Sequence, residues 1–261
     1  MRIKTFAGDF EFFLDKLKNN ENFAFSRFSD GELYIMQNKE LKIVNDHVRI
    51  GERVLPKGFS EQDHKHFNPN QHQKTRKLLI DSFKYKDEGY YKGISCRCCV
   101  GDASCDWMIN LHGGDDDSLT WSNLWINSNY PQFIERVVPE IIKQEVIFVC
   151  NEHADLTDTG FNVIRDYRCG SNCIVNDLGL ADKIVSDVLA YDIKNKIFLF
   201  AASSLSNILI HKLWMTSKEN TYIDIGTSLN HYIKMSMDRD YLKGYWLDKR
   251  AFGFGAKTCI W

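Results

Sequence analysis

The chain has 261 residues, of which 44% are hydrophobic and 26% are charged. These proportions are typical of soluble globular proteins and exclude a disordered chain, a collagen-like fibre and a coiled coil. The formal net charge is −2, which argues against nucleic acid as a partner, because nucleic-acid-binding proteins usually carry a basic excess or a basic face.

The first third of the chain predicts a strand between two helices, followed by a polar excursion. Residues 9–17 place apolar side chains at helical spacing, and residues 23–28 alternate as in a strand. A second helix is expected to start at residues 32–36. Residues 45–70 are polar and predict a long loop, and residues 73–83 predict the next helix.

The middle of the chain continues with alternating strands and helices. Residues 90–95 predict a strand and residues 104–111 a helix. A further strand is expected at residues 120–127. The helix expected at residues 130–138 has Pro131 in its first turn, where proline is well tolerated.

The last third contains the two most continuous apolar runs, at residues 145–150 and 196–202, which predict buried strands. Residues 178–190 have the pattern of an amphipathic helix, and another helix is expected to reach Trp214. The last predicted strand, residues 221–225, is expected to lead into a helix.

Buried strands that alternate with helices predict a parallel sheet covered on both faces. We therefore expect an α/β protein with one Rossmann-like, doubly wound, mostly parallel sheet in a single domain over residues 1–261. Residues from about 240 to 261 form an aromatic-rich extension, for which packing in a core or homodimer interface and stacking on a sugar both remain open. Ligands of such folds bind at the carboxyl ends of the strands.

The end of the first predicted strand carries Arg27, Asp30, Gly31 and Glu32. Carboxylate oxygens are ligands that Mg²⁺ and Mn²⁺ prefer, and a guanidinium binds phosphate oxygens in a bidentate manner. The same residues also fit an ordinary helix start, with Asp as the N-cap and Glu in the first turn. Spacing alone leaves both interpretations open.

Three other strand ends carry polar residues. Hydroxyls and backbone N–H groups at a helix start can bind a phosphate or a ribose, and a carboxylate inside an apolar strand is costly to bury without a partner. No Gly-x-Gly-x-x-Gly motif follows these strands, which argues against a dinucleotide fingerprint. The candidates are Ser203, Ser204 and Asn207; Asp224, Thr227 and Ser228; and Glu152 and His153.

Cysteine usage and targeting signals indicate a cytoplasmic protein. The N-terminus has no apolar run of signal-peptide length, and no stretch approaches the roughly 18 apolar residues of a membrane span. Reduced thiols are then the default. Four of the eight cysteines lie close together in the sequence: Cys96, Cys98, Cys99 and Cys105. Their spacing differs from that of a usual zinc site, in which two Cys-x-x-Cys-like pairs are separated by a longer loop.

These residues also resemble a known family, the glycosyltransferases of the GT-D fold type. The hallmark of that family is an Arg-Phe-Gly-Asp-Gly-Glu-like segment with a D-x-E motif, which resembles residues 27–32 here, with Ser29 where glycine is usual. The similarity extends over most of the chain, but residues 241–261 match nothing in the family. The other similar segments are residues 93–99, 125–131, 198–207 and 222–229.

The resemblance implies a glycosyltransferase, a hexosyl- or pentosyltransferase, that uses Mn²⁺ or Mg²⁺. The donor would be a nucleoside-diphosphate sugar, with UDP favoured, and the acceptor a hydroxyl of a glycan or glycoprotein. Asp30 and Glu32 would bind the metal and the diphosphate. Donor-binding candidates by position are Arg27, Ser29, Gly31, Asn127, Asn129, Ser203, Ser204, Asn207, Thr227 and Ser228.

Three alternatives remain open from the sequence. A general base, if the reaction needs one, would be Asp224, Glu152 or His153. A non-catalytic nucleotide- or sugar-binding module on the same fold is a second class of function. A zinc-binding protein that uses the cysteines between Cys96 and Cys105 is a third.

Overall fold

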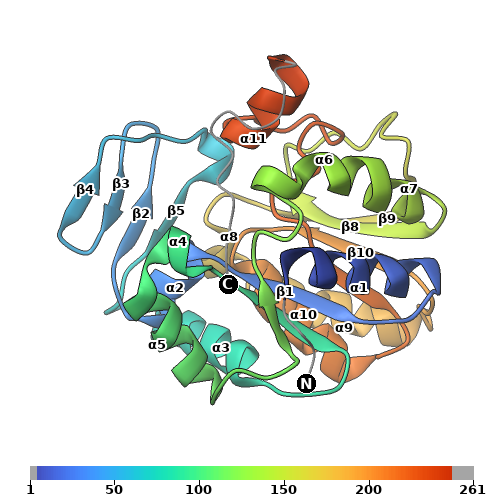
Figure 1. Ribbon diagram of the computed structural model, residues 1–261, viewed down its shortest axis with the longest axis horizontal. Coiled ribbons are helices and arrows are strands. Elements are labelled where there is room, and N and C mark those ends of the chain that lie inside the picture. Colours follow the sequence, from blue (N-terminus) through green and yellow to red (C-terminus); the bar gives the residue numbers. More distant parts are fainter. Residues whose placement is uncertain (1–4, 249–261) are drawn as a thin grey trace.

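The computed structural model describes residues 5–248 and contains two β-sheets (Figure 1). The larger sheet has seven strands in the order β7-β6-β1-β11-β10-β8-β9, and every neighbouring pair in it is parallel. Helices flank this sheet, which confirms the expected α/β class. Its strands are β1 (Ala24–Phe28), β6 (Tyr90–Ile94), β7 (Leu119–Trp121), β8 (Glu145–Asn151), β9 (Asn162–Cys169), β10 (Ile197–Ala201) and β11 (Thr221–Asp224).

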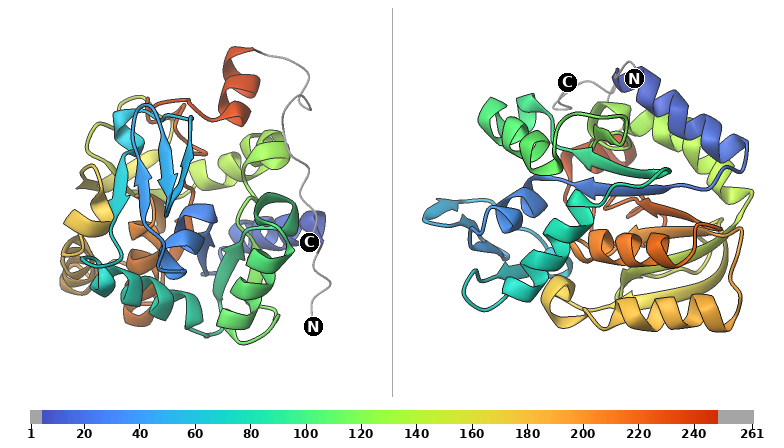
Figure 2. Two further views of the ribbon diagram at one scale, coloured as in Figure 1. Left: turned by 90° about the vertical axis from the view of Figure 1, so that its left-hand side faces the viewer. Right: turned by 90° about the horizontal axis from the view of Figure 1, so that it is seen from below.

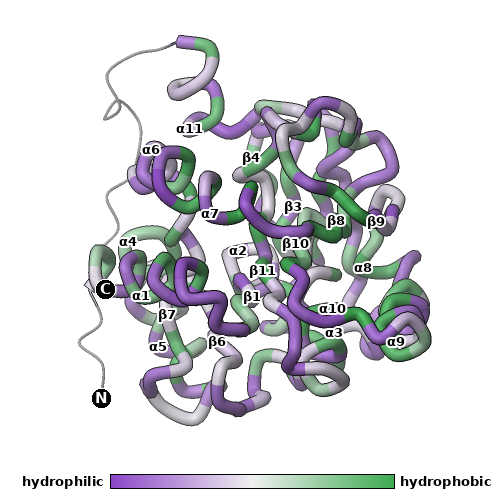
Figure 3. The backbone as a smooth tube through the Cα atoms, turned by 90° about the vertical axis from the view of Figure 1, so that its right-hand side faces the viewer, coloured by the Kyte–Doolittle hydropathy of each residue, from purple (hydrophilic) through white to green (hydrophobic). Residues whose placement is uncertain are grey.

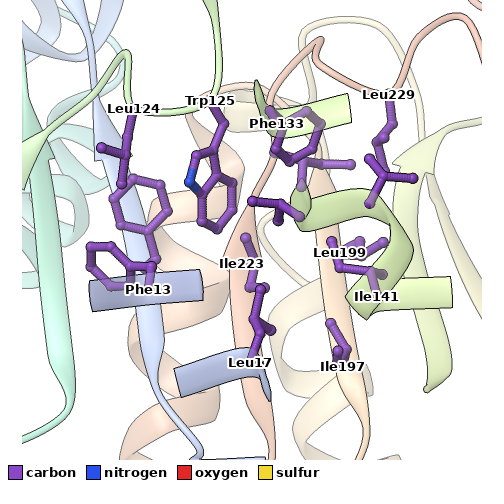
Figure 4. Packing of buried hydrophobic residues seen from close by; sticks show 14 of the residues in the cluster. Phe13, Leu17, Leu124, Trp125, Phe133, Ile141, Ile197, Leu199, Ile223 and Leu229 are labelled. Carbon is purple, nitrogen blue, oxygen red and sulfur yellow. The ribbon is translucent and has the colours of Figure 1, made fainter. Parts of the chain in front are cut away.

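Alternate residues of the central strands face two separate hydrophobic cores. On one side, Leu199 and Ile223 pack under α1 (Phe6–Lys18) and α7 (Val138–Ile142), as Figure 4 shows. On the other side, residues such as Phe198 pack under α9 (Leu180–Ala190) and α10 (Leu205–Thr216). The tube in Figure 3 is green along β8 and α10 and purple in many connecting loops. Burial of both faces explains why these strands read as continuous apolar runs.

The loop predicted at residues 45–70 is wrong in part, because this segment contains three short strands of a second, antiparallel sheet. This small sheet has the strand order β4-β3-β2-β5 and lies beyond the carboxyl end of β1 (Figure 2). It packs on a third core shared with α2 (Asp30–Met36) and α3 (Gln73–Lys84). Its strands are β2 (Leu41–Ile43), β3 (Val48–Ile50), β4 (Arg53–Leu55) and β5 (Lys65–Phe67).

Three further predictions differ from the structure. The strand expected at residues 120–127 ends at Trp121, and residues 127–129 form a 3₁₀ turn. The helix expected after β11 is replaced by consecutive turns, since Gly226 takes the left-handed conformation with φ +50°. Strand β9 was not predicted from the sequence, because it is a half-exposed edge strand with several charged residues.

Most of the remaining helices are short. The helix expected at residues 130–138 is interrupted by a π-helical segment. The helices not yet named are η1 (Glu61–Asp63), α4 (Arg97–Val100), α5 (Asp102–His112), η2 (Asn127–Asn129), α6 (Tyr130–Gln132), η3 (Phe133–Val137), α8 (Cys173–Asn176), α11 (Asp240–Leu242) and η4 (Lys243–Leu247). Within residues 5–248, no helix combines the length and the apolar character that a membrane crossing requires.

The aromatic extension is described only as far as residue 248. Its Trp246 side chain packs against the core under α1, and its Nε1–H donates a hydrogen bond to the Tyr130 hydroxyl at 2.8 Å. The ring of His231 stacks on Trp246 with ring centroids 3.7 Å apart. Three further aromatic residues of the extension lie outside the described residues: Phe252, Phe254 and Trp261.

Candidate functional site

The candidate site lies where the direction of strand addition in the large sheet reverses. From β1 the chain adds β6 and β7 on one side, and the later strands return from the opposite edge until β11 pairs with β1. In open α/β sheets ligands bind at such a switch point, outside the carboxyl ends of the strands. Arg27 near the end of β1 and Asp224 at the end of β11 therefore meet at the position where a ligand is expected.

The carboxylate of Asp224 is held by backbone donors from both strands. The N–H of Arg27 donates to its Oδ2 at 3.2 Å, and the N–H of Gly226 donates to its Oδ1 at 2.9 Å. Burial raises the pKa of Asp224 to about 7; Arg27 opposes this rise and the nearby Glu32 adds to it. Two buried carboxylates and one guanidinium thus form a charged cluster in which negative charge is in excess.

The Arg27 guanidinium is positioned by the backbone around it. Its Nε–H donates to the Ser122 carbonyl, and its side chain is only 9% exposed. A Cβ at Gly226 would lie 2.2 Å from Arg27 Nη1, so only glycine leaves room for the guanidinium at this place. Arg27 lines the cavity described below, where a guanidinium can bind an anionic ligand.

The D-x-E residues differ in their environment. Glu32 is buried, its Oε2 accepts from the Ser29 N–H at 2.9 Å, and its Oε1 accepts from the Ser204 hydroxyl. Asp30 is exposed, and its Oδ1 accepts from the Gly31 N–H at 3.0 Å. Glu32 therefore serves the start of α2 as the helix-start interpretation expects, but the N-cap is Ser29, so the expectation of Asp30 as the N-cap is wrong. Both Asp30 and Glu32 also line the cavity.

A cavity of about 620 Å³ joins these groups to the small sheet. One wall is the polar end of the large sheet. The opposite wall contains aliphatic side chains of β2, β3 and β4, such as Ile43, Ile50 and Leu55. Nine of the residues proposed from the sequence line this cavity: Arg27, Ser29, Asp30, Gly31, Glu32, Asn127, Ser203, Asp224 and Thr227.

Four proposed donor-binding residues are buried and do not line the cavity. Asn207 Nδ2 donates to the Arg27 carbonyl at 2.8 Å and to Ser26 Oγ at 3.0 Å. The other three are also used internally: Ser204 donates to Glu32, Ser228 Oγ to the Ile225 carbonyl, and Asn129 Nδ2 to the Leu124 carbonyl. These side chains hold the backbone of the site and do not face a ligand.

Two of the proposed general bases also lie outside the cavity. Glu152 and His153 are exposed in the turn after β8, whereas the neighbouring Asn151 faces the cavity. Asp224 is the candidate base that the structure brings beside Arg27 and Glu32.

Sequence reasoning missed the wall of the cavity that comes from distant segments. Lys65 on β5 reaches over the start of α2, where its Nζ is 3.6 Å from the position of a Cβ on Gly31. Arg239 lines the cavity and pairs with Asp63 at 3.2 Å. One signal was present in the sequence: two triplets with two apolar residues each, Val48–Ile50 and Arg53–Leu55, flank Gly51 and Glu52, which is a typical two-residue hairpin pattern.

If the cavity binds a nucleoside diphosphate, as the family resemblance implies, replacing Lys65 with methionine is expected to weaken that binding about 10-fold, because a cation that lines the cavity is removed while the side chain keeps a similar length. Calorimetry with UDP and Mn²⁺ measures this loss. The matched control is Lys57→Met, because Lys57 also lines the cavity but lies over the Phe59 ring. An equal loss in both variants would contradict a specific role for Lys65.

Comparison with known proteins places the fold. No protein-family model and no curated protein sequence matches the chain. Two solved structures match with a TM-score of 0.53, over 84% of this chain and 77% of theirs. One, 16% identical, is a selenomethionine-substituted structure of the domain of unknown function 1792, and the other, 15% identical, is described as that domain having a distinct glycosyltransferase fold. The chain therefore has a glycosyltransferase-like fold.

Proposed function

We propose that the protein is a metal-dependent glycosyltransferase. It would move a sugar from a nucleoside-diphosphate sugar, with UDP favoured, to a hydroxyl of a glycan or glycoprotein. The observation that supports this most is the cluster of Arg27, Glu32 and Asp224 at the switch point of a glycosyltransferase-like fold. The cavity beside it, about 620 Å³, is within the range of small-molecule sites.

We propose that carboxylates at this cavity hold a divalent cation. Asp30, Glu32 and Asp224 all line the cavity, and carboxylate oxygens are ligands that Mg²⁺ and Mn²⁺ prefer. Burial raises the pKa of Asp224, and the nearby Arg27 does not cancel this rise, so the cluster can accept more positive charge. We propose Asp30 and Glu32 as the ligands. A bound cation would supply electrostatic stabilisation of the diphosphate leaving group.

The side chains would divide the work of the transfer. Arg27 binds diphosphate oxygens through its terminal nitrogens and stabilises the negative charge that develops as the bond between sugar and diphosphate breaks. The acceptor oxygen forms the new bond to the anomeric carbon, and Asp224 takes the proton that this hydroxyl loses. Its pKa of about 7 suits a base that works near neutral pH.

The proposal is tested with Asp30→Asn, since Asp30 is exposed and the exchange should not disturb folding. The variant is expected to lose about 100-fold in kcat/KM for sugar transfer and to need more Mn²⁺ for half-maximal rate. Rates measured against Mn²⁺ concentration with UDP-sugars give both values. The control is Asp182→Asn, an exposed carboxylate in the first turn of α9, which is expected to leave both values unchanged.

Two outcomes would contradict the proposal. Turnover that is independent of metal and unchanged in Asp30→Asn would remove the role of the D-x-E carboxylates. Binding of UDP and Mn²⁺ by the unaltered protein, without hydrolysis or transfer for any donor, would favour a non-catalytic nucleotide-binding module.

A further inference from the structure

A group of three thiols lies outside the cavity, in the turn that follows β6. The Sγ atoms of Cys96, Cys98 and Cys99 all lie within 4.8 Å of one another, and those of Cys96 and Cys98 are 2.9 Å apart. None of the three residues lines the cavity. Cys96 is buried, whereas Cys98 and Cys99 are exposed. Exposed cysteines are uncommon in folded proteins, since cysteine is among the most buried residue types.

The other described cysteines differ from this group. Cys105, Cys150, Cys169 and Cys173 are all buried. The thiol of Cys173 donates to the Ala202 carbonyl at 3.2 Å, and burial raises the pKa of the Cys105 thiol. Because these four are buried, the exposed group needs a separate explanation.

The local backbone brings the three sulfurs together. Cys96 is extended and stands at the N-cap of α4, and its carbonyl accepts the N–H groups of Cys99 at 3.0 Å and Val100 at 3.2 Å. The single helical turn that results places residues three apart on one side. It ends at Gly101, whose φ of +81° lets the chain start α5 directly.

Two contacts hold this turn in place. The Cys96 side chain packs in the core under α1, so one sulfur is fixed. Arg97 extends to α5, where its guanidinium pairs with Asp106 at 2.7 Å and with Asp102 at 3.3 Å. These ion pairs are exposed and contribute little to stability, but they occupy the neighbouring charged side chains with one another.

We propose that Cys96, Cys98 and Cys99 bind one thiophilic d¹⁰ cation, Zn²⁺ or Cu⁺, at a site separate from the carboxylate cluster. Zinc–sulfur bonds of about 2.3 Å in tetrahedral geometry place the sulfurs about 3.8 Å apart. This spacing lies between the 2.9 Å that separates Cys96 and Cys98 and the 4.8 Å within which all three sulfurs lie. Each thiol releases its proton on binding. Sulfur and carboxylate ligands select different metals, so Mn²⁺ or Mg²⁺ does not compete for the thiols.

The site lies next to the segment that supports Arg27. The N–H of Ser122 donates to the Ile94 carbonyl at the end of β6, and the Ser122 carbonyl accepts from Arg27 Nε. A cation bound two residues after Ile94 would tie the exposed turn to the core through Cys96. We therefore expect binding to stabilise the fold.

The experiment uses the full chain, reduced and freed of metal, with Co²⁺ as the spectroscopic probe. We expect one equivalent of Co²⁺ to give intense near-ultraviolet thiolate-to-metal charge-transfer absorption. Zn²⁺ is expected to displace Co²⁺ and to raise the Tm by several degrees. Cu⁺, added under anaerobic conditions against a chromophoric chelator, tests the second cation. Retention of either ion at one equivalent supports the site.

The variants separate this site from other thiols. Cys98→Ser with Cys99→Ser removes two exposed sulfurs, so the metal-free Tm should not change, while metal affinity should fall at least about 100-fold. Cys105→Ala is the matched control and should bind as the unaltered protein does. Binding that persists in the double variant, or that disappears only in Cys105→Ala, would overturn the proposal. So would the absence of both the absorption and the Cu⁺ transfer.

Discussion

Replacing Gly226 with alanine is expected to lower kcat/KM for sugar transfer about 100-fold while the protein stays folded. The new Cβ would lie 2.2 Å from Arg27 Nη1, so the guanidinium must leave its place beside Asp224. Loss of one well-placed group that stabilises transition-state charge typically costs this much. Steady-state kinetics with a UDP-sugar and Mn²⁺ measures the loss, and a thermal melt checks the fold.

The matched control is Gly51→Ala in the β3–β4 hairpin. Gly51 has φ +56°, close to the +50° of Gly226, but no atom lies within 4 Å of its added Cβ. Both variants therefore pay the cost of alanine in the left-handed region, about 1–2 kcal/mol, and only Gly226→Ala displaces Arg27. Equal losses of activity in the two variants would show that backbone strain, and not the guanidinium, is responsible.

Lys92→Met is expected to stabilise the protein by about 2–4 kcal/mol at pH 6, with a gain that vanishes near pH 10.5. Lys92 on β6 is fully buried, and burial lowers its pKa to about 7; the nearby Asp116 opposes this shift and Lys86 adds to it. The folded state therefore holds this proton less tightly than the unfolded chain does. Each pKa unit corresponds to about 1.4 kcal/mol, and methionine loses the hydrogen bond to the Tyr85 carbonyl.

The pH dependence of this stability gain follows from proton linkage. Below pH 7 both states carry the charged lysine, so burial of the charge costs its full penalty, and between pH 7 and 10.5 the stability of the unaltered protein rises. Urea unfolding of both proteins at pH 6 and pH 10 measures the difference. Lys143→Met on the surface is the control and should change stability by less than about 0.5 kcal/mol at either pH. A gain of equal size at both pH values would contradict the assignment.

The large sheet was predictable because its central strands are buried on both faces. β8 and β10 are continuous apolar runs of strand length, and the helices between the strands keep helical spacing. The edge strand β9 lacks that signal, since Arg165, Asp166 and Arg168 interrupt it and much of it faces solvent. Its place in the sheet comes from pairing with β8, which local sequence does not encode.

The small sheet was missed because each of its strands has only three residues. Segments that short have little preference of their own, and pairing with one another and packing on α2 and α3 supply their stability. The turns after β11 are a different case. Residues 227–233 have an ordinary composition for a helix, but the left-handed Gly226 and the hydrogen bond between the hydroxyls of Thr227 and Tyr241 direct the chain elsewhere.

The residues of the candidate site could likewise be predicted only in part. Residues at the strand ends, such as Arg27 and Asp224, could be predicted because parallel strands bring their carboxyl ends to one edge. The sequence could not show which neighbouring residues face the cavity. Ser203 and Ser204 are adjacent, but only Ser203 lines it. The contribution of Arg239 depends on its contact with Asp63, 176 residues away, and that of Lys65 depends on the small sheet, which places Lys65 over the start of α2.

The small sheet forms a wall of the cavity that can vary in sequence independently of the charged wall. Its four strands pair only with one another among the described residues, and the chain enters and leaves them between two helices of the larger fold. A few hydrogen bonds, such as those from Ser60 to Asp238 and from Ser236 to Gln62, fasten η1 to the segment before α11. Substitutions on the cavity side of β2, β3 and β4 can therefore accumulate without touching the charged end of the large sheet. The aliphatic wall of the cavity can therefore vary in sequence while the charged wall stays the same.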